Sequence, residues 1–77
     1  MTAGTIEFRL DREFVELNQL LKLAGLADSG GAGKALVASG AVRVDGVVEL
    51  RKTAKIRAGQ LVLAGDAEIH VVGGTPP

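Results

Sequence analysis

Residues 29–34, with the sequence SGGAGK, place three glycines and a lysine directly before an apolar run. Glycines let a phosphate approach the backbone and a lysine adds a positive charge, so this spacing could bind phosphate. A nucleotide-binding P-loop would need Gly at 28 and Ser or Thr at 35, and the chain has Asp28 and Ala35. The dinucleotide-binding fingerprint also fails, because Leu36 stands where a small residue is needed. Two explanations remain for these glycines: contact with a phosphate of a polynucleotide, or close approach of another helix.

Groups for catalysis or metal binding are scarce in this sequence. His70 is the only histidine and there is no cysteine, which excludes disulfides and thiolate metal sites. His70 lies between Ile69 and Val71, whose side chains are expected to face inward, so we expect an exposed strand histidine. The serine and threonine hydroxyls have no second histidine to activate them, and the carboxylates lack ligand spacing. We therefore predict a non-enzymatic protein without metal, cofactor or small-molecule substrate; a small nucleotide-hydrolysing enzyme is the weakest alternative.

The charges are unevenly distributed, although the net charge of the 77 residues is zero. Between positions 22 and 57 there are seven basic and three acidic residues, whereas the flanks hold two basic and six acidic ones. This pattern predicts a molecule with one positive face, of the kind that contacts nucleic-acid phosphates. The basic residues of the central segment are Lys22, Lys34, Arg43, Arg51, Lys52, Lys55 and Arg57.

The composition indicates one small folded domain, since 47% of the residues are hydrophobic and 23% are charged. No apolar run approaches the roughly eighteen residues of a membrane span, and the first residues carry charges where a signal peptide would be apolar. We therefore expect a cytoplasmic protein that contacts no membrane. The pattern shows no long exposed apolar patch, so we also expect a monomer.

Hydrophobic periodicity predicts two helices after an initial strand over 5–10. The first helix is expected over 12–24, capped by Asp11 and ended by Gly25. The second is capped by Asp28 or Ser29 and ended by Gly40. The residues expected on the apolar side of the second helix are Ala32, Ala35, Leu36 and Val37.

After position 40 the apolar period changes from that of a helix to that of a strand. Strands are expected over 42–44, 47–49, 55–57, 61–63 and 68–72, with a hairpin turn at Asp45-Gly46. The order predicts an α+β domain in which a two-helix hairpin packs on a small, mostly antiparallel sheet of short strands. Phe8 and Phe14 are the only aromatic residues and lie on predicted core stripes. Because no aromatic is left for base stacking, any nucleic acid would be bound through phosphates and shape, which favours structured RNA.

Four segments together resemble the RNA-binding S4 domain, named after the fourth small-subunit ribosomal protein, and most of all its stand-alone bacterial YbcJ-like subfamily. They are Leu17-x-x-Leu20-Leu21-Lys22-x-x-Gly25, Ser29-Gly30-Gly31-x-x-Lys34, Ser39-Gly40-x-Val42-Arg43-Val44-Asp45-Gly46, and Glu49-x-Arg51-Lys52 followed by Lys55-Ile56 and Ala58-Gly59-Gln60. The resemblance predicts flexible ends at 1–5 and 73–77 around an RNA-binding domain at 6–72. It implies an αL-type motif, in which the start of the second helix and the following hairpin contact an RNA stem.

The chain departs from the S4 pattern at two positions. Gly30 stands where many S4 domains have Arg, so the phosphate contact would depend more on backbone amides. Asp45 stands where Asn is common, and its negative charge favours a role in the turn over contact with RNA.

The resemblance and the charge pattern predict a non-catalytic module that binds structured RNA, an rRNA or tRNA stem or stem-loop, with the ribosomal particle as a further candidate partner. The alternative is a protein-interaction module whose basic face binds an acidic partner. The predicted RNA-binding residues are Ser29, Gly30, Gly31, Lys34, Arg43, Arg51, Lys52 and Lys55, with Lys22 and Arg57 as secondary candidates.

Overall fold

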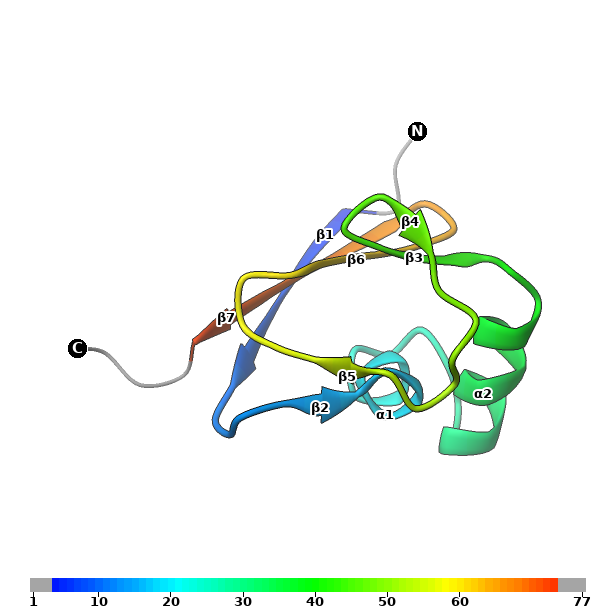
Figure 1. Ribbon diagram of the computed structural model, residues 1–77, viewed down its shortest axis with the longest axis horizontal. Helices are drawn as coiled ribbons and strands as arrows, with labels where there is room; N and C mark the ends of the chain where they lie inside the picture. The colour runs from blue at the N-terminus through cyan, green and yellow to red at the C-terminus, as the bar shows by residue number, and fades with distance from the viewer. Residues whose placement is uncertain (1–3, 74–77) are drawn as a thin grey trace.

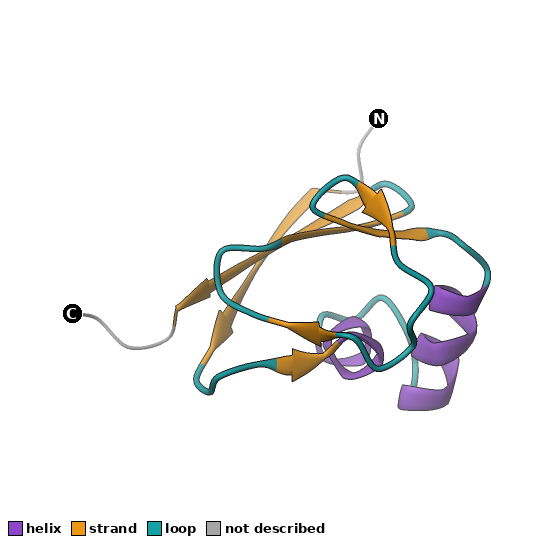
Figure 2. Ribbon diagram, viewed as in Figure 1, coloured by secondary structure: helices purple, strands orange, loops and turns teal. Residues whose placement is uncertain are grey.

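The computed structural model describes residues 4–73, which form two helices beside two sheets (Figures 1 and 2). Within the ends predicted to be flexible, Gly4 and Thr5 belong to the first strand and Gly73 to the last, and the other positions lie outside the described residues. No helix in this part of the chain is long and apolar enough to cross a membrane. The elements are β1 (Gly4–Leu10), β2 (Val15–Glu16), α1 (Leu17–Leu23), α2 (Gly30–Ala38), β3 (Val42–Val44), β4 (Val47–Val48), β5 (Lys55–Ile56), β6 (Leu61–Ala64) and β7 (Ala67–Gly73).

The larger sheet has the strand order β1-β7-β6-β3-β4. Its pairs are antiparallel except for β1 and β7, which run parallel and join the two ends of the described chain (Figure 1). The predicted α+β class with a mostly antiparallel sheet is confirmed. The parallel pair was not predicted, because strand alternation gives the buried face of a strand but not its neighbour.

The first helix is shorter than predicted. Residues 12–16 are not helical, because Val15 and Glu16 pair with Ile56 and Lys55 to form the two-stranded sheet β2–β5. Glu16, not Asp11, is the N-cap of α1, and its side chain makes no capping bond. Backbone carbonyls from the 52–54 segment accept from the first amides of α1 instead: Leu17 N donates to Ala54 O at 2.8 Å and Asn18 N to Lys52 O at 3.1 Å. A tertiary contact therefore sets the start of this helix.

The second helix begins and ends where the sequence predicts, but its buried face differs. Ser29 is the N-cap and Gly40 has a φ of +83° after the last turn. Gly33 and Val37 are buried against α1, whereas Ala32 and Ala35, expected on the apolar side, are exposed. The helix turns its small Gly33 toward α1 because the two helices cross closely there; in Figure 1 α1 is seen nearly end-on and α2 from the side.

The core lies between the larger sheet and the helices. Leu17, Leu20 and Leu21 of α1 are fully buried and pack with Val37 and with the inward residues of the strands. Phe8 packs against this core, as predicted. Phe14 does not belong to the core and is only half-buried, so its assignment to core packing was wrong. The reason is that it precedes β2 with its side chain on the outward face of the β2–β5 ribbon, opposite to Val15.

Candidate nucleic-acid interface

The start of α2 presents backbone amides to solvent. Ser29 Oγ accepts a hydrogen bond from Ala32 N at 3.0 Å, and Gly33 N donates to Ser29 O at 2.9 Å. The amides of Gly30 and Gly31 have no intrahelical acceptor, as in any first helical turn, and they lie at the positive end of the helix dipole. Lys34 is exposed, and its spacing of three and four residues places it on the same helix face as these two glycines. This arrangement can hold an anion.

The three glycines of α2 differ in what surrounds them. A Cβ at Gly33 would lie 2.5 Å from the carbonyl oxygen of Asn18, so Gly33 is required for helix packing. A Cβ at Gly30 would meet the side-chain nitrogen of Gln19 at 2.9 Å, which a flexible side chain can avoid. At Gly31 the nearest atom would be Ser29 Oγ at 3.8 Å, an ordinary contact. Close packing therefore accounts for Gly33 but gives no reason for a glycine at 31.

Asn18 connects the start of α2 to the basic segment 51–57. Its backbone amide donates to Lys52 O, and its side-chain Nδ2 donates to Gly30 O at 3.4 Å. Asn18 is 2% exposed, and its Oδ1 has no hydrogen-bond partner within residues 4–73. Asn18 was not predicted as a site residue, since a polar residue beside an apolar stripe does not by itself predict burial. Asn18 therefore links the backbone of Gly30 to the backbone of Lys52, although the two are far apart in the sequence.

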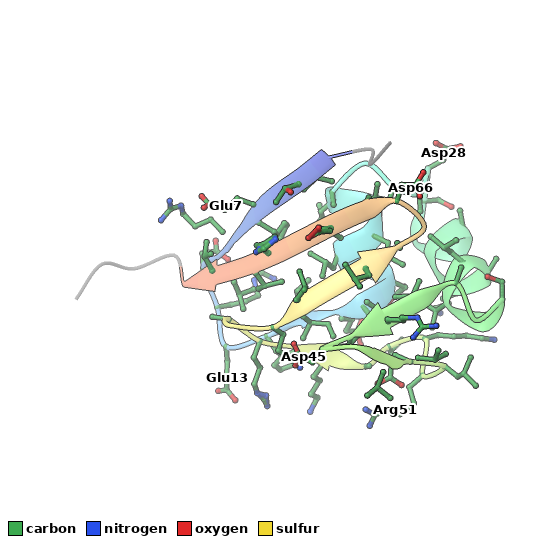
Figure 3. The ribbon with its side chains drawn as sticks, turned by 90° about the horizontal axis from the view of Figure 1, so that it is seen from above. Glu7, Glu13, Asp28, Asp45, Arg51 and Asp66 are labelled. Carbon is green, nitrogen blue, oxygen red and sulfur yellow. The ribbon has the colours of Figure 1, made fainter. Side chains whose placement is uncertain are left out.

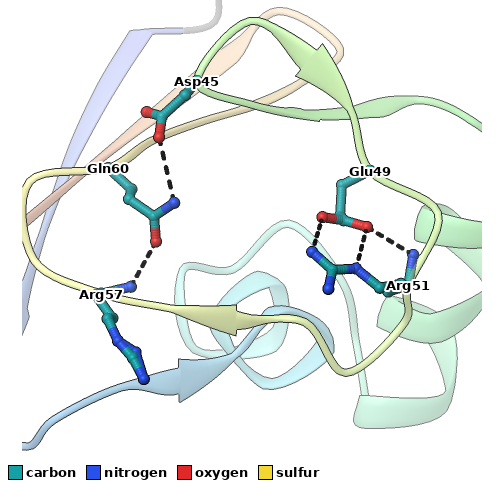
Figure 4. A network of polar contacts seen from close by, with 5 residues as sticks. All are labelled: Asp45, Glu49, Arg51, Arg57 and Gln60. Carbon is teal, nitrogen blue, oxygen red and sulfur yellow. Dashed lines mark hydrogen bonds and ion pairs between the residues drawn. The ribbon is translucent and has the colours of Figure 1, made fainter.

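Arg51 is held by Glu49 (Figure 4). Arg51 Nε and Nη2 donate to the two carboxylate oxygens at 3.0 and 2.9 Å, and its backbone amide donates at 2.9 Å. The hydrogen bonds from Arg51 lower the pKa of Glu49 to about 2, and the carboxylate in turn raises the pKa of Arg51. The charge of Arg51 is thus balanced by an acid two residues earlier, outside the acid-free stretch 51–57. A shallow pocket of about 400 Å³ lies at the segment between β4 and β5, where it is lined by Arg51, Thr53, Ala54 and Lys55.

Lys55 and Arg57 lie on the outward face of the β2–β5 ribbon. The Lys55 ammonium is 4.9 Å and the Arg57 guanidinium 5.8 Å from the centre of the Phe14 ring. Arg57 Nη2 is 3.8 Å from a carboxylate oxygen of Glu13, a residue whose side chain is largely exposed. The Arg57 amide donates to Gln60 Oε1 at 2.8 Å, which fixes its backbone (Figure 4).

Arg43 and Lys22 lie on β3 and α1, two elements that carry none of the other predicted residues. Arg43 is exposed on the face of the larger sheet that points away from the core, because Val42 on the same strand is buried. Lys22 is exposed in the last turn of α1, where a cation also interacts favourably with the helix dipole. The structure therefore places Ser29, Gly30, Gly31 and Lys34 at one helix start and links this start through Asn18 to the backbone of Lys52. Arg51, Lys55 and Arg57 lie along the same segment as Lys52, and Arg43 and Lys22 lie on β3 and α1.

Asp45 forms the predicted hairpin turn and also fixes the hairpin to β6. Asp45 and Gly46 have φ values of 51° and 87°, as the turn requires. The Asp45 carboxylate accepts from Leu61 N at 2.9 Å and from Gln60 Nε2 at 3.2 Å (Figure 4). Both hydrogen bonds lower the pKa of Asp45, and the one from Leu61 N has the larger effect. Its role is therefore in the turn, as predicted.

The acidic residues lie on more than one side of the molecule. In Figure 3 Glu7, Asp28 and Asp66 project away from Arg51, whereas Glu13 and Asp45 lie on the same side as Arg51. His70 is exposed, with its Nε2 3.6 Å from Glu68. Over the described range 4–73, no three His, Asp or Glu side chains gather in a way that could hold a metal ion.

Comparison with known proteins identifies the family. Residues 8–72 match the model of the S4 domain. The chain is 50% identical over 58 residues to two proteins, "Putative RNA-binding protein YbcJ" of Escherichia coli (strain K12) and "Uncharacterized protein YbcJ" of Shigella flexneri; each match covers 75% of this chain and 83% of the relative. The solution structure of YbcJ from E. coli, described as revealing an αL motif involved in RNA binding, superimposes with a TM-score of 0.70 at 42% identity and covers 94% of this chain and 92% of that one. On sequence and on fold, this chain belongs to the S4 domain family.

Proposed function

We propose that this protein is a non-catalytic module that binds structured RNA, a stem or stem-loop of rRNA or tRNA, through its phosphates. The observation that carries the proposal is the exposed start of α2. Gly31 and Lys34 are exposed there, and Asn18 links the Gly30 carbonyl to the backbone of Lys52. A phosphate at this point would accept from backbone amides beside the Lys34 ammonium, and Lys52 on the linked segment would contact the same RNA.

The relatives support the same class of ligand. The E. coli relative carries RNA binding in its name, and its structure is described as containing an RNA-binding αL motif. The proposed phosphate contact does not require an arginine at position 30, because backbone amides and lysines bind a phosphate without a bidentate guanidinium.

A ¹⁵N chemical-shift titration with an RNA stem-loop, and separately with a single strand, tests the proposal. We expect shifts at 29–34 and 51–55 with the stem-loop, and an affinity that falls by roughly one log unit per log unit of salt for each phosphate contact. No shift at low salt would exclude RNA as the ligand.

The second candidate is a protein-interaction module, and one observation favours it. Val47 and Leu50 are 69% and 60% exposed on the segment that leads into Arg51 and Lys52, so apolar and basic groups are adjacent there. An acidic protein would contact both. Salt-sensitive capture of such a protein, together with indifference to RNA in the titration, would support this candidate over the first.

A further inference from the structure

Phe14 is one of only two aromatic residues in the chain, and it is neither buried in the core nor free of neighbours. It lies half-buried on the outward face of the β2–β5 ribbon, where Lys55 and Arg57 approach its ring. An aromatic ring flanked by cations on a sheet face is the arrangement with which proteins stack an unpaired base and hold its phosphate.

Phe14 also borders a groove of about 580 Å³, which is lined mainly by apolar surface. Phe8 and Leu10 from the end of β1 and Leu23 from α1 contribute to it, and Leu23 is an exposed large apolar side chain. A flat, apolar base can occupy such a groove against the Phe14 ring, whereas a phosphate cannot be desolvated there.

Charged groups of both signs surround Phe14. Lys55 and Arg57 lie over the ring, and the charged residues that edge the groove are Asp11, Arg12, Glu13 and Glu16. Asp11 is already bonded to Arg12 at 3.2 Å, and Glu13 lies 3.8 Å from Arg57. Carboxylates repel a phosphate but accept hydrogen bonds from the amino groups of bases, so a base in the groove with its phosphate at Lys55 and Arg57 is the orientation that these groups favour.

We infer that Phe14, with Lys55 and Arg57, forms a site for one unpaired nucleotide of the bound RNA. The inference rests on the proposed function and adds to it. The phosphates of a stem bind at the start of α2 and at Lys52, and a bulged or loop nucleotide next to that stem stacks on Phe14. The protein then prefers an interrupted stem to a continuous one, a preference that phosphate contacts alone do not give.

The test compares two RNA hairpins, one with a continuous stem and one with a single bulged 2-aminopurine, whose fluorescence falls when it stacks. We expect the protein to bind the bulged hairpin more tightly by between about fivefold and about a hundredfold, the range that one base on an aromatic ring provides, with quenched fluorescence. Phe14→Leu should remove both the preference and the quenching while leaving the affinity for the continuous stem unchanged. Phe14→Tyr keeps the ring and should restore both, and the amide spectrum of each variant checks its fold.

The outcomes separate the two proposals. Equal affinity for both hairpins without quenching overturns the nucleotide site at Phe14 and leaves the proposed function standing. If neither hairpin binds at low salt, the proposed function fails, and the site at Phe14 fails with it. Loss of the preference in Phe14→Tyr as well as in Phe14→Leu would also contradict stacking.

Discussion

Gly33 of α2 lies against the backbone of Asn18 in α1 so closely that a Cβ at position 33 would be 2.5 Å from the Asn18 carbonyl oxygen. The same Asn18 donates through its side chain to Gly30 O and through its amide to Lys52 O. This helix crossing therefore sets where the open start of α2 lies relative to the basic loop.

Gly33→Ala should destabilise the fold although alanine is the better helix former. The added methyl meets a backbone oxygen that cannot move alone, and overpacking of this kind costs about 1–3 kcal/mol. Gly31→Ala is the matched control, because its Cβ would make only an ordinary contact with Ser29 Oγ at 3.8 Å, and it should be neutral or stabilising by up to about 1 kcal/mol. Urea unfolding of both variants measures the difference, and equal stabilities would contradict the close crossing.

Ser29→Ala should lower the free energy of unfolding by about 1 kcal/mol, because the hydrogen bond from Ala32 N to the Ser29 hydroxyl is lost. Ser29→Asp should keep the cap and the stability, since aspartate is a good N-cap. It should nevertheless weaken RNA binding by placing a negative charge beside the Gly30 and Gly31 amides. Ser29→Asn is the uncharged control, and if Asp and Asn bind RNA equally well, no phosphate lies at this helix start.

The Glu49 carboxylate should titrate with a pKa of about 2, well below its ordinary value of 4.5, because Arg51 donates three hydrogen bonds to it. A pKa that is lower in the folded state means that the pair stabilises the fold above about pH 4.5, and that this contribution is lost as the pH falls from there toward 2. The ¹³C shift of the Glu49 carboxyl measures the midpoint. In Arg51→Gln the midpoint should return toward 4.5, and an unchanged midpoint would mean that Arg51 is not the cause.

Lys34→Gln and Lys52→Gln should each weaken binding of an RNA stem and reduce the slope of log affinity against log salt by about one. Arg9→Gln is the control, because Arg9 lies on β1 and is paired with Glu7 at 3.7 Å, away from the proposed interface. Glu49→Gln should act in the opposite direction and raise the affinity, since it leaves the charge of Arg51 unbalanced. Equal slopes of log affinity against log salt for the two lysine variants and the Arg9 variant would mean that the phosphate contacts lie elsewhere on the protein.

Asp45→Ala should lower the unfolding temperature more than Asp45→Asn. Alanine loses the acceptor of the bonds from Leu61 N and Gln60 Nε2 and is strained at a φ of 51°, whereas asparagine tolerates this conformation and still accepts from an amide. Thermal unfolding followed by circular dichroism compares the two. A larger effect of asparagine would show that the charge, not the turn, is what matters at this position.

Local patterns were enough to predict much of this protein. The cap at Ser29, the end of α2 at Gly40, the turn at Asp45-Gly46 and the α+β class follow from the chemistry of single residues and from hydrophobic period. The resemblance to the S4 domain also came from the order and spacing of short motifs, and the match over residues 8–72 confirms it. These features depend on neighbours in the sequence, which is why the sequence alone determined them.

Contacts between distant residues decided the rest. Val15 and Glu16 lie inside the helix predicted over 12–24, but they pair with Ile56 and Lys55, and this pairing shortens α1 and leaves Phe14 outward. The different roles of Gly31 and Gly33, the burial of Asn18 and the pairing of β1 with β7 depend in the same way on which segments meet. A sequence pattern gives the face that a residue prefers to bury; only the tertiary structure decides what that face meets, because the free energy gained there comes from partners that no local pattern contains.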